Sequence, residues 1–233
     1  FHPVDSEYAN HFQDEHKKLV LVEANDTTYY YLTKVYEAEK NVEGKLSELL
    51  RGTENKEQYP ALEEYINQSI MNLKERIGES FEVELFRKER KNLYENIFNK
   101  KLFIVSGSAG SGKSYEVLNI INHLENHERQ NYLLLAPTGK AALRLSTDHD
   151  FSNIKASTID KFIFDTIKGK ISIAEIKQYK NVIIDEMSMV DLLKFEKLLG
   201  IFNFMEPSFK RLILIGDPNQ LPAIGFGRVL ADL

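Results

Sequence analysis

The feature that most constrains this 233-residue chain is an eight-residue run near its middle, Gly-Ser-Ala-Gly-Ser-Gly-Lys-Ser at positions 107–114. The apolar segment 102–105 precedes the run, and the segment that follows it, 115–124, is compatible with a helix. The run has the spacing of a phosphate-binding loop, G-x-x-x-x-G-K-[ST]. A strand, such a loop and a helix in succession bring backbone N–H groups together at a helix N-terminus, where they attract a phosphate. The run therefore predicts an α/β fold built around a nucleotide-phosphate site.

Each residue type in this loop has a chemical reason. Glycines permit the tight turn and the close approach of the backbone to phosphate oxygens. Lys113 can reach the β- and γ-phosphates of ATP, which makes it a candidate catalytic residue, and the hydroxyl of Ser114 can ligate Mg²⁺. The predicted ATP-binding residues of the loop are Gly107, Gly110, Ser111, Gly112, Lys113 and Ser114.

Two adjacent carboxylates end another apolar segment, where Asp185 and Glu186 follow residues 181–184. In a P-loop domain, the first carboxylate after such a strand can hold the Mg²⁺ shell while the second polarises the attacking water. We therefore predict Asp185 as a nucleotide and metal ligand and Glu186 as a catalytic residue. Without the loop, a solvated Asp-Glu pair at a strand end would be an equally good interpretation.

A further apolar segment, 211–215, runs into a polar turn at 216–219. Gln220 follows the turn and could reach a γ-phosphate across a cleft, so it is the third predicted catalytic residue beside Lys113 and Glu186. Taken alone, Gly-Asp-Pro-Asn is ordinary turn chemistry. Its position after the loop and the carboxylate pair favours the functional interpretation.

In this order, the segments resemble the helicase motifs of superfamily 1, in the RecD-like branch that moves 5′ to 3′ on single-stranded DNA. The resemblance runs from about Leu102 to the end of the chain, and its motifs I, Ia, II and III correspond to residues 107–114, 135–142, 185–191 and 216–222. It implies a P-loop NTPase fold with a RecA-like parallel sheet and flanking helices. It also implies the ATP-binding half of an ATP-dependent DNA helicase or translocase.

The resemblance further implies contacts with the backbone of single-stranded DNA. The residues it points to are Pro137, Thr138, Lys140, Ser157 and Thr158. The structural alternative is that Thr138, and either Ser157 or Thr158, cap the N-termini of helices.

The chain also departs from the family pattern. Residues 86–91 contain no glutamine, although the family reads adenine with a glutamine about fifteen to twenty residues before motif I. Asp160 and Lys161 stand where relatives usually carry His and Arg. The sequence therefore does not specify which nucleobase is bound or how residues 160 and 161 contact a DNA strand.

Half of the expected active site lies outside this sequence. The resemblance implies a second RecA-like domain with an arginine finger beyond Leu233 in the same full-length chain, so the present chain should bind nucleotide but hydrolyse it poorly. Subunits of a recombination complex are further candidate partners. The alternative function is a nucleotide-gated interaction subunit of a recombination or DNA-mobilisation complex.

Along the chain, the pattern changes near residue 100. We predict a smaller, mainly helical N-terminal region with a β-hairpin at residues 1–95 and the ATP-binding domain at 96–233. The hairpin should pair residues 18–22 with 28–32 through Asn25-Asp26, and helices should cover 33–50, 60–77 and 83–98. The buried strands should cover 102–105, 132–136, 182–184 and 212–215.

The composition excludes some kinds of site and partner but does not indicate a function. The formal net charge of −5 lacks the basic bias of an autonomous nucleic-acid binder, so DNA contacts should be local. The absence of cysteine excludes disulfides and thiolate metal sites. Without an apolar run of membrane-spanning length or a signal peptide, we expect a cytoplasmic protein with no membrane partner.

Overall fold

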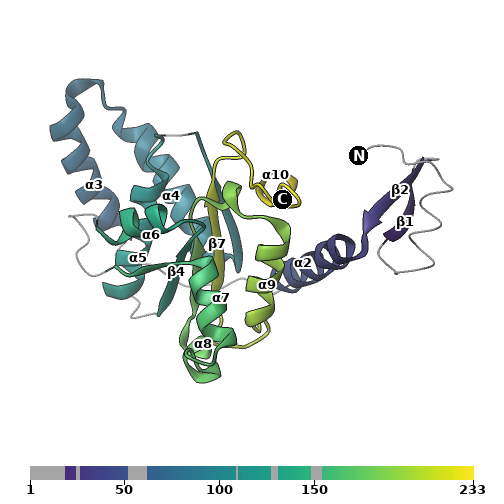
Figure 1. Ribbon diagram of the computed structural model, residues 1–233. Coiled ribbons are helices and arrows are strands. Elements are labelled where there is room, and N and C mark those ends of the chain that lie inside the picture. The colour runs from purple at the N-terminus through teal and green to yellow at the C-terminus, as the bar shows by residue number, and fades with distance from the viewer. Residues whose placement is uncertain (1–18, 25–26, 52–61, 109, 127–130, 148–153) are drawn as a thin grey trace.

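The centre of the molecule is a five-stranded parallel sheet, seen edge-on among its helices in Figure 1. The computed structural model describes residues 19–24, 27–51, 62–108, 110–126, 131–147 and 154–233. Across the sheet the strands are β3 (Leu102–Ser106), β7 (Arg211–Gly216), β6 (Asn181–Ile184), β4 (Tyr132–Ala136) and β5 (Ala156–Thr158). The predicted fold class and the four predicted strands are confirmed, whereas β5 was not predicted as a strand.

Alternation along the central strands divides the core into two layers. Leu133 and Leu135 face one layer, whereas Leu134 and Ala136 face the other, and β6 and β7 alternate in the same way. This follows from the two-residue period of a strand. Every residue of β6 and β7 is buried, as expected for parallel strands with helices on both faces.

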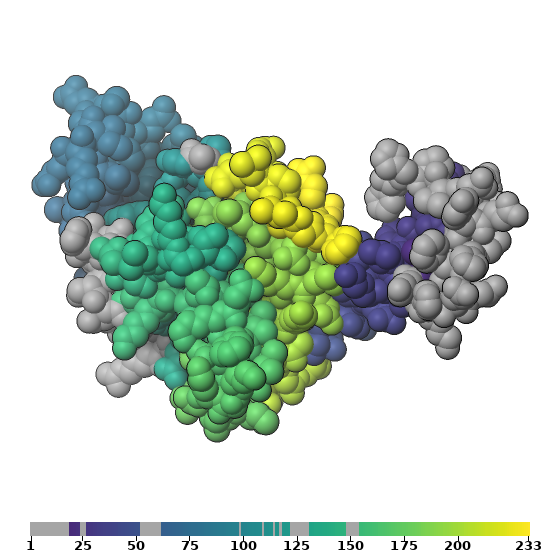
Figure 2. Space-filling model, viewed as in Figure 1, coloured from purple at the N-terminus to yellow at the C-terminus, as the bar shows by residue number. Residues whose placement is uncertain are grey.

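Helices cover both faces of the sheet. The layer that contains Leu133 is built by α2 (Thr33–Arg51), α7 (Ile159–Ile167), α8 (Ile173–Gln178), α9 (Leu192–Ile201) and the short α10 (Val229–Asp232). The opposite layer is built by α3 (Leu62–Ile77), α4 (Val83–Asn99), α5 (Lys113–Asn126) and α6 (Gly139–Ser146). Short elements are η1 (Gly78–Ser80), η2 (Met187–Met189) and α10 (Val229–Asp232), and the C-terminal segment that includes α10 is the yellow surface of Figure 2.

The N-terminal elements agree with the sequence pattern. Strands β1 (Leu19–Ala24) and β2 (Thr27–Leu32) form the predicted antiparallel hairpin, which projects from the end of α2 in Figure 1. The predicted turn at Asn25-Asp26 and the predicted helix start at Pro60 lie outside the described residues. Helices α2, α3 and α4 pack onto the two faces of the sheet, and the boundary near residue 95 stays a prediction. None of the described helices is long and apolar enough to cross a membrane.

Strand register brings the strand ends to one edge. Ser106 lies opposite Gly216, Ile184 lies opposite Leu214 and Leu135, and Ala136 lies opposite Thr158. Because all five strands are parallel, the segments that follow them start close together. All the residues singled out in the sequence therefore follow or end strands at this edge.

Docking of α2 gives a stability prediction. Leu49 is 1% exposed in the core, whereas its neighbour Leu50 is 71% exposed. Leu49→Ala should lower the free energy of unfolding by about 2–5 kcal/mol, because it removes buried methyl groups and leaves a cavity. Leu50→Ala should change it by less than about 0.5 kcal/mol. Chemical denaturation measures both, and equal effects would mean that α2 is not part of the folded core.

Candidate active site

The phosphate-binding loop joins the end of β3 to the start of α5. Gly110 and Gly112 have φ values of 78° and 85°, in the left-handed region that glycine adopts without strain. The N–H of Gly107 donates to the carbonyl of Gly216 at 3.3 Å, which fixes the start of the loop to β7. A Cβ on Gly107 would lie 2.9 Å from the Oγ of Ser111. The positive φ values therefore favour glycine at positions 110 and 112.

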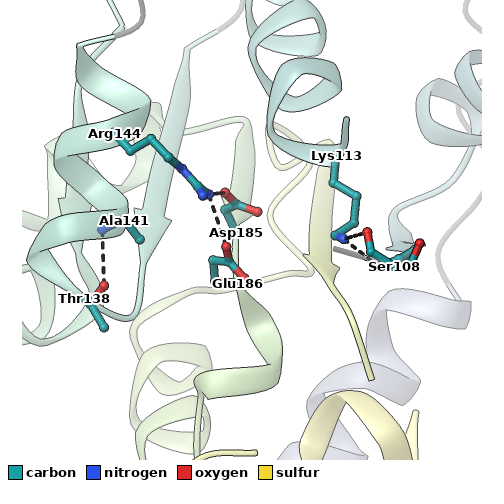
Figure 3. Close-up of polar contacts among 8 residues, drawn as sticks. Ser108, Lys113, Thr138, Ala141, Arg144, Asp185 and Glu186 are labelled. Carbon is teal, nitrogen blue, oxygen red and sulfur yellow. Dashed lines mark hydrogen bonds and ion pairs between the residues drawn. The ribbon is translucent and has the colours of Figure 1, made fainter. Parts of the chain in front are cut away.

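The side chain of Lys113 bonds to the backbone of its own loop. Its Nζ donates to the carbonyl oxygens of Gly107 at 2.5 Å and Ser108 at 2.7 Å, as the dashed lines in Figure 3 show. The residue is also the first of the 14-residue helix α5, whose N-terminus carries a partial positive charge. The side chain and the helix thus add positive potential at the same place, which suits an anion.

The two predicted carboxylates directly follow β6. Asp185 is 1% exposed, and its N–H donates to the carbonyl of Leu135 at 2.9 Å, which continues the ladder between β6 and β4. Glu186 has φ 53° and ψ 41°, and it is the non-glycine residue with positive φ in the described part of the chain. Such a conformation costs of order 1 kcal/mol and is typical of functional sites. The backbone therefore leaves the strand direction at Glu186, directly after Asp185.

Arg144 joins these carboxylates and was not singled out in the sequence. Its Nη2 lies 3.1 Å from Oε1 of Glu186 and 3.4 Å from Oδ2 of Asp185, and Figure 3 shows it reaching from α6 to both. The adjacency of β4 and β6 explains the contact, because α6 follows β4. A buried, charged carboxylate needs a cationic partner. Only the order of the strands in the sheet shows that Arg144 is this partner for Asp185.

The turn after β7 holds Gln220 near the segment that follows Glu186. Asp217 is buried, and its Oδ1 accepts from the N–H of Asn219 at 3.0 Å while its carbonyl accepts from the N–H of Gln220 at 3.1 Å. The side chains of Gln220 and Ser188, a residue of η2, line one small cavity of about 10 Å³. The turn chemistry expected from the sequence is present, and it joins this segment to η2.

The residues predicted to touch DNA end the neighbouring strands. Pro137 is buried and Lys140 is exposed. Thr138 caps α6, since its Oγ1 accepts from the N–H of Ala141 at 3.2 Å, and Thr158 caps α7 by accepting from the N–H of Lys161 at 3.1 Å. Ser157 is half-buried in β5. The capping interpretation is confirmed for both threonines, and the DNA contact stays a prediction.

Where the family carries its adenine-reading glutamine, this chain has a buried ion pair. Arg90 of α4 lies 3.1 Å from Glu116 of α5, and the hydroxyl of Tyr94 donates to the same carboxylate at 3.1 Å. Burial raises the pKa of the Glu116 carboxyl, although both partners act in the opposite direction. The pair anchors α4 to the first turn of α5.

Beside that turn lies a cavity of about 390 Å³. It is lined by Asn72, Leu73 and Arg76 of α3 and by Tyr115 of α5. Tyr115 is the third residue of α5, the helix that begins at Lys113 of the phosphate-binding loop.

Comparison with known proteins agrees with this geometry. A family model described as an AAA domain matches residues 90–226. The chain belongs to the AAA domain family. The chain is 30% identical over 158 residues to the RecBCD enzyme subunit RecD of Haemophilus influenzae, and the match covers 56% of this chain and 23% of that protein. It is 29% identical over 147 residues to the ATP-dependent RecD2 DNA helicase of Deinococcus radiodurans, covering 62% of this chain and 19% of the relative.

A crystal structure of the Pif1 helicase from Candida albicans is also similar to this AAA domain. The identity is 27% and the TM-score 0.41, over 57% of this chain and 32% of the other. The chain spans less than a third of the length of the RecD relatives it matches. The resemblance to RecD-like superfamily 1 helicases is confirmed.

Proposed function

We propose that this AAA domain is the ATP-binding half of an ATP-dependent DNA helicase or translocase of the RecD-like branch. The observation that carries the proposal is the arrangement at one sheet edge, where the phosphate-binding loop with its lysine follows β3 and the Asp-Glu pair follows β6, with only β7 between these two strands. The names of the RecD and RecD2 relatives support a DNA helicase.

The residues present fit Mg·ATP. The left-handed glycines shape a loop for phosphate oxygens, and the buried carboxylate of Asp185 already accepts a cationic partner. In our proposal, Lys113 binds the β- and γ-phosphates with the loop backbone, while the hydroxyl of Ser114 and the carboxylate of Asp185 hold Mg²⁺. Bound Mg²⁺ would neutralise charge on the phosphate oxygens.

Hydrolysis needs a positioned water and a sensor of the γ-phosphate. Glu186 lies next to the proposed metal ligand and its side chain is 19% exposed, against 2% for Asp185, which suits a group that orients water rather than metal. Gln220, held beside η2, is the proposed sensor. Transition-state charge would be stabilised by an arginine finger from a second RecA-like domain of the full-length chain, so this half alone should turn over slowly.

Single-stranded DNA is the proposed polymer partner. Pro137, Thr138, Lys140, Ser157 and Thr158 end β4 and β5 or begin the helices after them, at the same edge as Glu186. Contacts from these residues would be mainly to the DNA backbone and would not read sequence. Subunits of a recombination complex are proposed as further partners, by analogy with the RecD relative.

The function is tested by ATP hydrolysis in the full-length protein with and without single-stranded DNA. Glu186→Gln keeps the shape of the side chain but removes the general base, so it should lower DNA-stimulated kcat by about 10²-fold or more. The matched control is Glu95→Gln, an exposed residue of α4, which should leave kcat unchanged. Turnover that DNA does not stimulate would favour a nucleotide-gated interaction subunit instead.

We further propose that the nucleobase occupies the cavity beside α5. Tyr115 offers an aromatic face for stacking, while the amide of Asn72 and the guanidinium of Arg76 offer polar contacts to the edge of a purine. Gln68 donates to Oδ1 of Asn72 at 3.3 Å, which orients that amide. These groups would replace the glutamine that the family uses.

Base binding is tested with a ligand that has no base. Tyr115→Ala should weaken ATP binding by about tenfold through lost stacking, but leave inorganic tripolyphosphate binding unchanged. Met71→Ala, an exposed residue on α3, is the control. An equal loss for both ligands, or no loss for ATP, would place the base elsewhere.

A further inference from the structure

Helix α6 has a different candidate contact at each end. Its N-terminus carries the cap Thr138 and the exposed Lys140, both proposed to meet the DNA backbone. Arg144 lies one turn after Lys140, and residues four apart share a helix face. Its guanidinium contacts Glu186 at 3.1 Å and Asp185 at 3.4 Å. One short helix therefore connects the proposed strand contact to both carboxylates.

We propose that Arg144 is a positioning residue that couples the binding of single-stranded DNA at the start of α6 to the orientation of Glu186. The inference rests on the proposed function, since it requires an ATP site and a DNA site. It assigns a role to Arg144, which has no role in the sequence motifs or in the proposed reaction.

The construction of α6 suits this role. The helix has eight residues, which corresponds to a length of roughly 12 Å. Its inner face is anchored by Ala142 and Leu145, both buried in the core layer shared with α5. The Oγ of Ser146 donates to the carbonyl of Ala142 at 3.0 Å and accepts from the N–H of Ala156 at 3.0 Å, which ties α6 to β5. A shift of α6 on binding DNA would therefore carry Arg144 and the start of β5 together.

The charges explain why Arg144 can respond to the nucleotide. Its side chain is 54% exposed, whereas the side chain of Asp185 is 2% exposed, so the arginine is the solvent-facing end of the contact. Mg²⁺ and the guanidinium are alternative cationic partners for Asp185. When the metal is held there, the shorter contact to Glu186 would remain for Arg144.

The contact between Arg144 and Glu186 would affect catalysis by orienting the Glu186 carboxylate. The Glu186 side chain is 19% exposed and lies 3.1 Å from the guanidinium, so this contact can set the direction of its carboxylate. If α6 moves when single-stranded DNA binds, the guanidinium of Arg144 moves with it. The guanidinium would then hold the Glu186 carboxylate toward the attacking water only when DNA is bound. Arg144 thus acts through Glu186 and touches no reacting atom itself.

The test measures binding coupling in the full-length protein. The dissociation constant of single-stranded DNA is determined with and without a non-hydrolysable Mg·ATP analogue, and the ratio gives the coupling. In the wild type this ratio should lie within roughly 5- to 150-fold. Arg144→Gln should bring it close to one while ATP affinity stays within about threefold of wild type, because only a coupling contact is lost. Arg144→Lys, which keeps the charge without the fork, should restore part of the ratio.

Leu143→Ala, an exposed neighbour on α6, is the control and should keep the wild-type ratio. Wild-type coupling retained in Arg144→Gln would overturn the inference while leaving the proposed function intact. Loss of ATP binding in Arg144→Gln would also overturn it, because Arg144 would then be a nucleotide-binding residue. A wild-type protein whose DNA affinity ignores the nucleotide would overturn both proposals.

Discussion

The parallel register of the sheet is the constraint on which the rest of this molecule depends. Ser106 pairs with Gly216, and the N–H of Gly107 then donates to the Gly216 carbonyl, so the phosphate-binding loop starts against the end of β7. Ile184 pairs with Leu135 and Leu214 in the same register, which places Asp185 at the same edge. A slip of one residue would turn every side chain of a strand to the opposite core layer, so the packing of the two layers locks this arrangement. The site is therefore a consequence of how the core packs.

Two cations at this edge have partners for which the proposed Mg·ATP would compete. Lys113 binds backbone carbonyls of its own loop, and Arg144 binds the carboxylates of Asp185 and Glu186. Carbonyl dipoles are weaker partners for an ammonium than phosphate oxygens are. Mg²⁺ in turn prefers carboxylate oxygens such as that of Asp185. These contacts keep the charges satisfied and in place before a ligand binds.

Much of the fold could be predicted from the sequence because its signals are local. Buried parallel strands are continuous apolar runs, and the β3, β4, β6 and β7 segments have that pattern. Strand β5 escaped prediction because Ala-Ser-Thr is short, polar and only half-buried at the sheet edge. The bounds of α2 and α4 followed from their helical periodicity and flanking residues.

Contacts between distant segments could not be predicted in the same way. The order β3-β7-β6-β4-β5 is not written in any local pattern, and without it Arg144 is one exposed arginine among others. The ion pair of Arg90 with Glu116 and the cavity beside Tyr115 likewise depend on how α3 and α4 pack against α5. The sequence thus predicts which residues have the chemistry for the site, whereas the contacts between these residues can be identified only from the fold.

The central claim is that the loop and the carboxylates form one Mg·ATP site, and equilibrium binding of ATP to this chain tests it most directly. We expect Lys113→Ala to weaken ATP binding by about tenfold or more with or without Mg²⁺, since a charge-assisted contact to phosphate is lost. Asp185→Asn should remove only the part of the affinity that depends on Mg²⁺. ATP binding that neither substitution changes would contradict the claim and leave the sheet edge without a nucleotide.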